Sequence, residues 1–114
     1  MSLREEQSAF AKDVNSLLTY IHSAEWEVSF GEVLRTPEMQ EIYVQTGKSK
    51  TKNSNHLLKC AIDLNFFFDG VIKTSKSDLQ RFGDYWETLN PKNRWGGNWK
   101  SFQDCPHFER NQYS

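Results

Sequence analysis

The stretch SNHLLKCAIDLNFF, residues 54–67, is the most apolar run of the chain, yet it carries one histidine and one aspartate. Strand alternation gives this segment two different faces, with Ala61, Asp63 and Asn65 on one and Cys60, Ile62, Leu64 and Phe66 on the other. A buried carboxylate is costly unless its charge is compensated, and a metal cation is the strongest compensator. His56 lies seven positions before Asp63, where a loop can fold it back beside the carboxylate.

Length and charge restrict the classes of protein that fit. A chain of 114 residues has room for one core, so we expect residues 1–114 to form a single domain. The formal net charge of -1 offers no basic face for a nucleic acid. No run approaches the length of a membrane span, and the N-terminus lacks the apolar core of an export signal. We therefore expect synthesis in the cytoplasm and no stable membrane insertion.

Hydrophobic spacing and capping signals predict an α+β fold, with a small antiparallel sheet flanked by helices. Thr36 and Pro37 mark one helix start, and Ser75 or Ser77 marks another. The basic loop 48–55 has no apolar anchor, so we expect it to be mobile or ordered only by what it contacts. We expect helices over about residues 4–23, 36–47 and 75–89. We expect strands over residues 26–30, over residues 60–72 with a hairpin turn at Asp69-Gly70, and over the terminal HFER.

A second segment, DCPHFE at residues 104–109, supplies further polar groups. His56, Asp63 and His107 have the ligand types of catalytic zinc sites that keep a fourth position open. Asp104 suits a carboxylate that does not bind the metal but accepts a proton. The spacing alone is not diagnostic, so a structural coincidence stays open. A closed structural zinc site of Cys60 and Cys105 with His56 and His107 is a weaker alternative, against which strand alternation argues; buried, inert thiols are the default.

These segments together resemble the M15 zinc peptidases, and in particular the phage-type L-alanyl-D-glutamate peptidases. The resemblance rests on SNHLLKCAID, DCPHFE, LRTPEMQEIY and RWGGNWKSFQDCPHFE, which follow one another in the order of the family and span most of residues 28–110. It implies the fold that the family shares with the signalling domain of hedgehog proteins. One departure is Lys59, which replaces a glycine often found three residues after the first histidine, and it leaves the local loop geometry open.

The resemblance also implies roles for single residues. His56, Asp63 and His107 match the zinc ligands, and Asp104 matches the catalytic base. Arg35 matches an arginine that binds a substrate carbonyl or carboxylate and assists catalysis. Ser54 matches a serine that lines the site, where it binds substrate or hydrogen-bonds within the outer shell. For Trp95, substrate contact and support of the cleft wall both stay open, as do an orienting role and solvent exposure for Glu109.

The expected function is therefore zinc-dependent hydrolysis of peptidoglycan stem peptides between L-Ala and D-Glu, in phage-type lysis of the host cell wall. We expect a monomer that reaches the wall through a holin-type permeabilising partner. The alternatives are a D-alanyl-D-alanine carboxypeptidase and a non-catalytic wall-binding module on the same fold.

Overall fold

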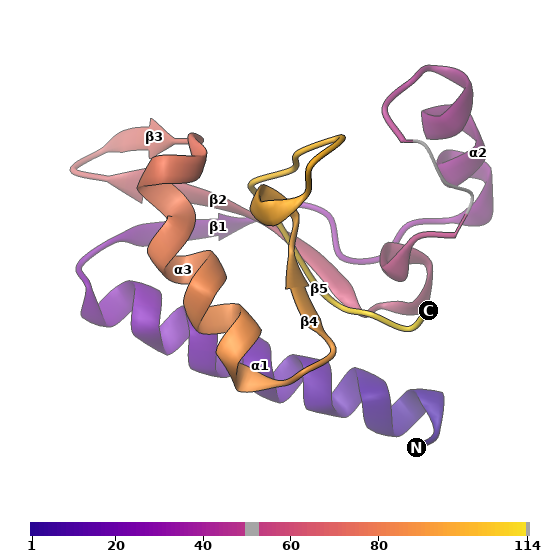
Figure 1. The fold of residues 1–114 in the computed structure, drawn as a ribbon, viewed down its shortest axis with the longest axis horizontal. Helices are drawn as coiled ribbons and strands as arrows, with labels where there is room; N and C mark the ends of the chain where they lie inside the picture. Colours follow the sequence, from indigo (N-terminus) through magenta and orange to yellow (C-terminus); the bar gives the residue numbers. More distant parts are fainter. Residues whose placement is uncertain (50–52, 114) are drawn as a thin grey trace.

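A computed structural model describes residues 1–49 and 53–113 (Figure 1). The predicted mobility of loop 48–55 falls in part on residues 50–52, which lie outside the described residues. In the described part no helix is long and apolar enough to cross a bilayer. The elements are α1 (Leu3–Ser23), β1 (Glu27–Phe30), α2 (Pro37–Gln45), the 3-10 turn η1 (Asn55–Leu58), β2 (Ala61–Phe68), β3 (Val71–Lys73), α3 (Lys76–Leu89), β4 (Asn93–Trp95), the 3-10 turn η2 (Gly96–Asn98) and β5 (His107–Arg110).

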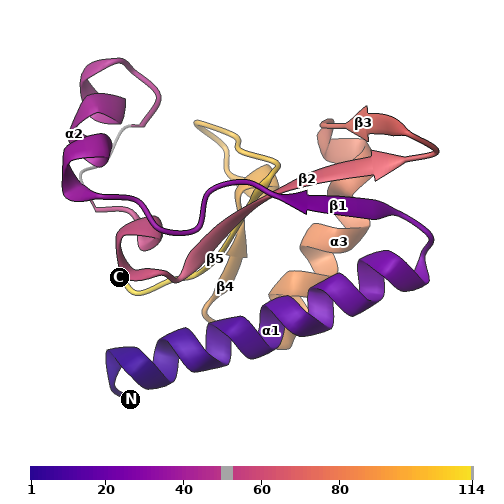
Figure 2. The same cartoon turned by 180° about the vertical axis from the view of Figure 1, so that it is seen from behind.

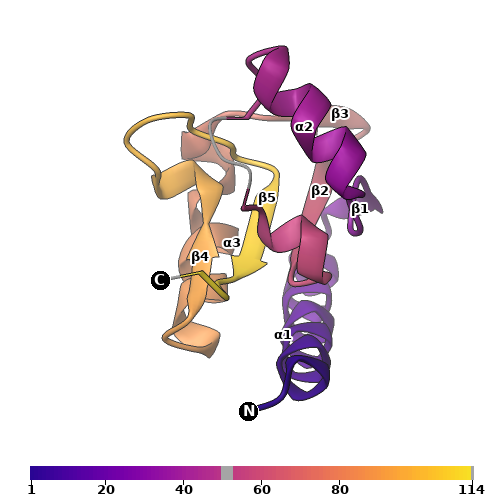
Figure 3. The same cartoon turned by 90° about the vertical axis from the view of Figure 1, so that its right-hand side faces the viewer.

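The sheet is antiparallel and is built around β2, which confirms the predicted α+β class. Its strand order is β1-β2-β5-β4, and β3 also pairs with β2. Helices α1 and α3 pack together and against the sheet, whereas α2 stands at the other end of the molecule (Figures 1 and 3). Seen from behind, β1 and β2 run side by side and β3 folds back along β2 (Figure 2).

Capping groups start the helices where the sequence indicates. Thr36 caps α2, and Ser75, not Ser77, caps α3 by accepting a hydrogen bond from the backbone N–H of Asp78. The Asp69-Gly70 turn has both residues at positive φ, which confirms the predicted hairpin. The structure adds β4, which lies outside the strand ranges expected from the sequence.

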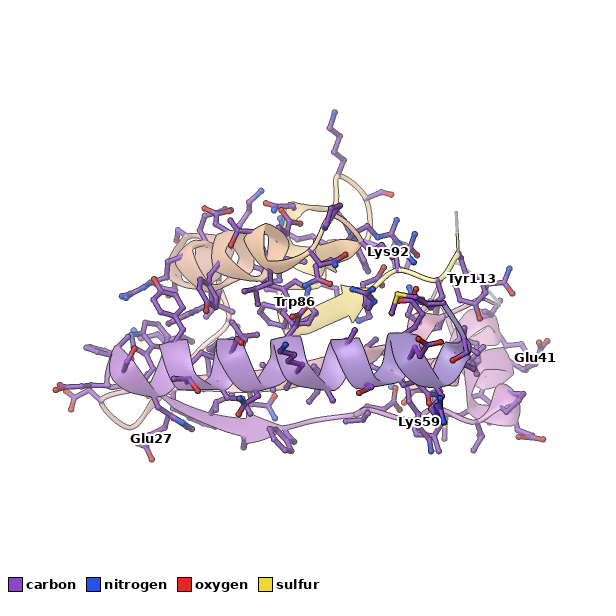
Figure 4. The ribbon with its side chains drawn as sticks, turned by 90° about the horizontal axis from the view of Figure 1, so that it is seen from below. Glu27, Glu41, Lys59, Trp86, Lys92 and Tyr113 are labelled. Atoms are coloured by element: carbon purple, nitrogen blue, oxygen red, sulfur yellow. The ribbon has the colours of Figure 1, made fainter. Side chains whose placement is uncertain are left out.

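Aromatic side chains fill the core between α1, α3 and the sheet. Ile62, Leu64 and Phe66 of β2 all point into it, as the predicted alternation requires. Phe66 stacks on Phe82 of α3 at 5.2 Å between ring centroids. Trp86 lies between α3 and α1 in Figure 4, and its indole N–H donates to the Glu109 carbonyl of β5 at 3.0 Å. The helices thus fix the strand that carries His107.

Candidate active site

The sheet register brings together residues that are far apart in the sequence. Asp63 of β2 pairs with His107 of β5. The segment that follows β1 then holds the neighbouring backbone: Gly31 donates to the Asp63 carbonyl at 2.7 Å, and Asp63 donates to the Glu32 carbonyl at 2.9 Å. The Arg35 N–H donates to the His56 carbonyl at 3.1 Å. One short segment therefore positions both ends of the H-x6-D motif.

His56, Asp63 and His107 form a cluster whose ligand atoms all lie within 4.8 Å of one another. His56 Nε2 is 3.3 Å from Asp63 Oδ1, and His107 Nδ1 is 3.4 Å from the same oxygen. Both histidines are buried, and Asp63 is partly buried. The structure thus brings the three predicted ligands together.

Hydrogen bonds on the far side of each ring set the tautomers. His56 Nδ1 lies 3.0 Å from the Val33 carbonyl, which only accepts, so this nitrogen carries the proton. His107 Nε2 lies 2.6 Å from Glu109 Oε1, which holds a proton there. His56 Nε2 and His107 Nδ1 then turn their lone pairs toward the carboxylate of Asp63. Such partners orient metal-binding histidines in many sites.

The convergent lone pairs fit a cation. Asp63 Oδ1 is buried and has no hydrogen-bond partner among the described residues. Burial alone would raise the pKa of the Asp63 carboxyl, but the contacts with His107 and His56 hold it well below its usual range. Burial would likewise lower the pKa of His107, but Asp63 and Glu109 raise it to about 9. A divalent cation would compensate these carboxylates instead, and its binding requires the neutral form of His107 with the Nδ1 lone pair free.

Asp104 lies beside this cluster without belonging to it. Its Oδ2 is 3.9 Å from His107 Nδ1, and its side chain is 46% exposed. Partial burial raises the pKa of the Asp104 carboxyl, and the nearby His107 offsets this only in part. The Asp104 N–H donates to the Gly96 carbonyl at 2.9 Å, so η2 sets the position of this carboxylate.

A pocket of about 290 Å³ opens over the cluster, and its wall includes Arg35, Ser54, His56, Trp99, Asp104 and His107. The Arg35 guanidinium is largely engaged: it forms an ion pair with Glu32, donates to Gln40 Oε1 at 2.7 Å and approaches Ser54 Oγ at 3.4 Å. Ser54 also accepts the His56 N–H at 3.2 Å. Both predicted residues therefore face the pocket and support the loop that carries His56.

Trp95 lies in the core instead of the pocket wall. Its side chain is fully buried, and its indole N–H donates to the Cys105 carbonyl at 2.7 Å. A Cβ on Gly83 would lie 2.1 Å from the indole ring, so the backbone of α3 packs directly against the ring. Of the two roles left open for Trp95, this position favours structural support over substrate contact. Trp99 lines the pocket, with its ring centroid 4.9 Å from that of His107.

The cysteines take no part in the cluster. Cys60 and Cys105 are both buried free thiols, and burial raises the pKa of each. Among the described residues the metal-ligating group consists of two histidines and one aspartate only. The structure thus gives no support to a closed site with cysteine ligands.

Comparisons with known proteins agree with this geometry. A peptidase M15 family model, described as D-alanyl-D-alanine carboxypeptidase, matches residues 47–110. The chain belongs to the M15 peptidase family. It is also 32% identical over 100 residues to an L-alanyl-D-glutamate peptidase of a Listeria phage. That match covers 83% of this chain but 34% of the relative, so the chain spans about a third of its length.

A solved structure shares the fold of this M15 chain. The Serratia marcescens L-Ala D-Glu endopeptidase ChiX superposes with a TM-score of 0.73 at 24% sequence identity, over 95% of this chain and 85% of that protein. The family resemblance and the fold predicted from the sequence are therefore confirmed.

Two features of this M15 site concern positions that the sequence left open. Glu109 is 3% exposed and hydrogen-bonds His107, which favours the orienting role over solvent exposure. Lys59 adopts the left-handed conformation with φ 56, where glycine has no steric penalty. The loop therefore keeps a glycine-like conformation without the glycine.

Sequence reasoning missed Arg94, whose guanidinium donates to Oε2 of Glu109 at 2.5 Å, the oxygen that does not contact His107.

Proposed function

We propose that this protein is a zinc-dependent peptidase that hydrolyses peptidoglycan stem peptides between L-Ala and D-Glu. The observation that carries the proposal is the buried, unpartnered Asp63 Oδ1 between two histidine nitrogens whose protons are held elsewhere. Two histidines and one carboxylate match the ligand set of catalytic zinc sites. The names of the phage relative and of ChiX support the choice of bond.

His56, Asp63 and His107 would hold the zinc ion. When bound, zinc acts as a Lewis acid and lowers the pKa of water. The chain's own residues hold the rest of the site: Val33 and Glu109 orient the two imidazoles, and burial shields His56 and His107 from bulk solvent. The metal identity is part of the proposal.

Asp104 is placed to move the proton. Its carboxylate faces the pocket next to the ligand cluster, and its raised pKa brings it closer to the operating pH of a general base. We propose that it accepts a proton from the attacking water and returns it to the leaving amine. Arg35 can bind the substrate carbonyl by exchanging its long 3.4 Å contact with Ser54 for one to the substrate.

The description of the family model favours a second candidate, a D-alanyl-D-alanine carboxypeptidase. The same ligands and base serve either reaction, so the position of the cut distinguishes them. A non-catalytic wall-binding module has less support, because it does not require a carboxylate such as Asp104 in the pocket. In a phage setting we further propose action at the cell wall by a monomer, with a holin-type protein opening the membrane.

The test combines metal content with product masses. Purified protein, its Asp104→Asn variant and its His107→Ala variant are incubated with purified stem peptide. We expect the wild type to bind one zinc per chain and to cleave between L-Ala and D-Glu. Asp104→Asn should keep its zinc but lose at least roughly a hundredfold in rate. His107→Ala should lose both the zinc and the activity. Release of the terminal D-Ala would favour the second candidate. Absence of zinc from the wild type, or full activity of Asp104→Asn, would refute the mechanism.

A further inference from the structure

Arg94 presents a fixed guanidinium at the pocket wall. Its Nε and Nη2 donate to Glu109 Oε2 at 2.8 and 2.5 Å, and Nη2 also donates to Asn111 Oδ1 at 3.1 Å. Glu109 binds His107 through its other oxygen. The Glu109 carboxylate therefore bridges the Arg94 guanidinium and His107, one of the three candidate metal ligands. Its side chain is still 49% exposed, and it lines the pocket.

The other cations of the pocket are less suited to an anionic ligand. Arg35 is only 12% exposed, and its guanidinium nitrogens already contact Glu32, Gln40 Oε1 and Ser54 Oγ. Lys48 also lines the pocket, and its Nζ lies over the Tyr43 ring at 5.8 Å from the ring centroid. Arg94 Nη1 has no hydrogen-bond partner among the residues that the structure describes. Arg94 can therefore donate to a ligand without releasing Glu109.

We infer that Arg94 binds the free carboxylate of the glutamyl residue in the substrate. This inference rests on the proposed function and deepens it. A glutamyl residue that is linked through its amine and one carboxyl group keeps its second carboxylate ionised, close to the bond that is cut. Guanidinium groups bind carboxylates with charge-assisted hydrogen bonds.

Charge in the pocket makes such a cation necessary. The Asp104 carboxylate faces the same space and repels a substrate anion, and Glu109 is already bound to Arg94. Asn55, Asn111 and Tyr113 also line the pocket, and Asn111 Oδ1 accepts a hydrogen bond from Arg94 Nη2. Arg94 thus determines specificity for an acidic residue, whereas zinc and Asp104 act at the bond itself.

The test compares two substrates that differ only in charge. One stem peptide carries the free glutamyl carboxylate and the other carries the carboxamide at that position. Zinc-loaded wild type, Arg94→Gln, Arg94→Lys and the control Arg81→Gln, which alters an arginine of α3 outside the pocket, are assayed for kcat and KM. Zinc content is measured for each, since loss of metal would reveal an effect through Glu109 and His107.

We expect the wild type to prefer the acidic peptide by roughly 10- to 100-fold in kcat/KM. Arg94→Gln should remove this preference, mainly through a higher KM for the acidic peptide, so that the kcat/KM values of the two peptides come within about threefold of each other. Arg94→Lys should restore part of it, and Arg81→Gln should keep all of it. An equal loss on both peptides, or a wild type without preference, overturns the inference. A wild type that cleaves neither peptide overturns the proposed function first, and this inference with it.

Discussion

His107 Nε2 and Glu109 Oε1 are 2.6 Å apart, and both side chains are buried. The two residues lie on the same face of β5, so the strand itself sets their spacing. This contact fixes which nitrogen of His107 faces Asp63. We therefore expect its loss to weaken metal binding more than it destabilises the fold.

We therefore predict that Glu109→Ala weakens zinc binding about 10- to 100-fold. Competition with a chromophoric chelator measures this affinity directly, without any substrate. The control is Glu27→Ala, which changes an exposed residue of β1. An unchanged zinc affinity in Glu109→Ala would show that the ring of His107 is held by other contacts.

Gly96 permits the close approach of the Asp104 segment. A Cβ at position 96 would lie 2.2 Å from the Asp104 carbonyl oxygen and 3.0 Å from its Cβ. We predict that Gly96→Ala displaces Asp104, which should lower kcat by about 100-fold, as misplacement of about 1 Å does. Overpacking should also cost about 1–3 kcal/mol of stability.

Three measurements separate these effects: kcat, zinc content and the midpoint of urea unfolding. Zinc should stay bound, because His56 and Asp63 lie on other segments and His107 is also held by Glu109 and by the pairing of β5 with β2. Lys100→Ala, an exposed change in the same loop, serves as the control. Full activity of Gly96→Ala would mean that Asp104 does not depend on η2 for its position.

The sequence predicted most of the local structure because the signals for it are local. The capping residues Thr36 and Ser75, the Asp69-Gly70 turn and the alternation in β2 each act over a few residues. The three ligands were also predicted, although by resemblance more than by spacing. Their meeting depends on the pairing of Asp63 with His107, which no local pattern specifies.

Residues with purely non-local partners were harder to predict. Trp95 is an aromatic residue between polar neighbours, and its burial follows from Gly83 on a different element. The role of Arg94 required β4, which the Gly- and Asn-rich composition of its surroundings concealed. A strand at Asn93–Trp95 places Arg94 opposite Glu109, and only that register shows the contact.

Lys59 follows η1 in the left-handed conformation, and its side chain is exposed. A residue with a Cβ loses about 1 kcal/mol or more in this conformation, whereas glycine does not. We predict that Lys59→Gly raises the free energy of unfolding by about 0.5–1 kcal/mol, after the greater freedom of glycine in the unfolded chain is subtracted. Urea unfolding measures it, with Lys59→Ala as a control that should give no gain. Equal stability of the glycine and alanine variants would contradict the explanation.

Glu6 of α1 is buried in an ion cluster far from the metal ligands. Its carboxylate accepts from Lys92 Nζ at 2.5 Å and from Arg110 Nε. In Figure 4, Lys92 lies over the N-terminal half of α1. The hydrogen bonds from Lys92 and Arg110 outweigh the effect of burial and lower the pKa of Glu6 from 4.5 to about 2.

A lowered pKa in the folded state makes the contribution of Glu6 fully present above pH 4.5 and removes it as the pH falls toward 2. We predict that Glu6→Gln lowers Tm at pH 7 and that the difference from wild type shrinks between pH 4.5 and pH 2. Thermal unfolding followed by circular dichroism across this range measures the difference, in which the other carboxylates cancel. The control is Glu27→Gln, which changes an exposed residue of β1. A Glu6→Gln difference that is independent of pH would show that packing, and not charge, accounts for the effect.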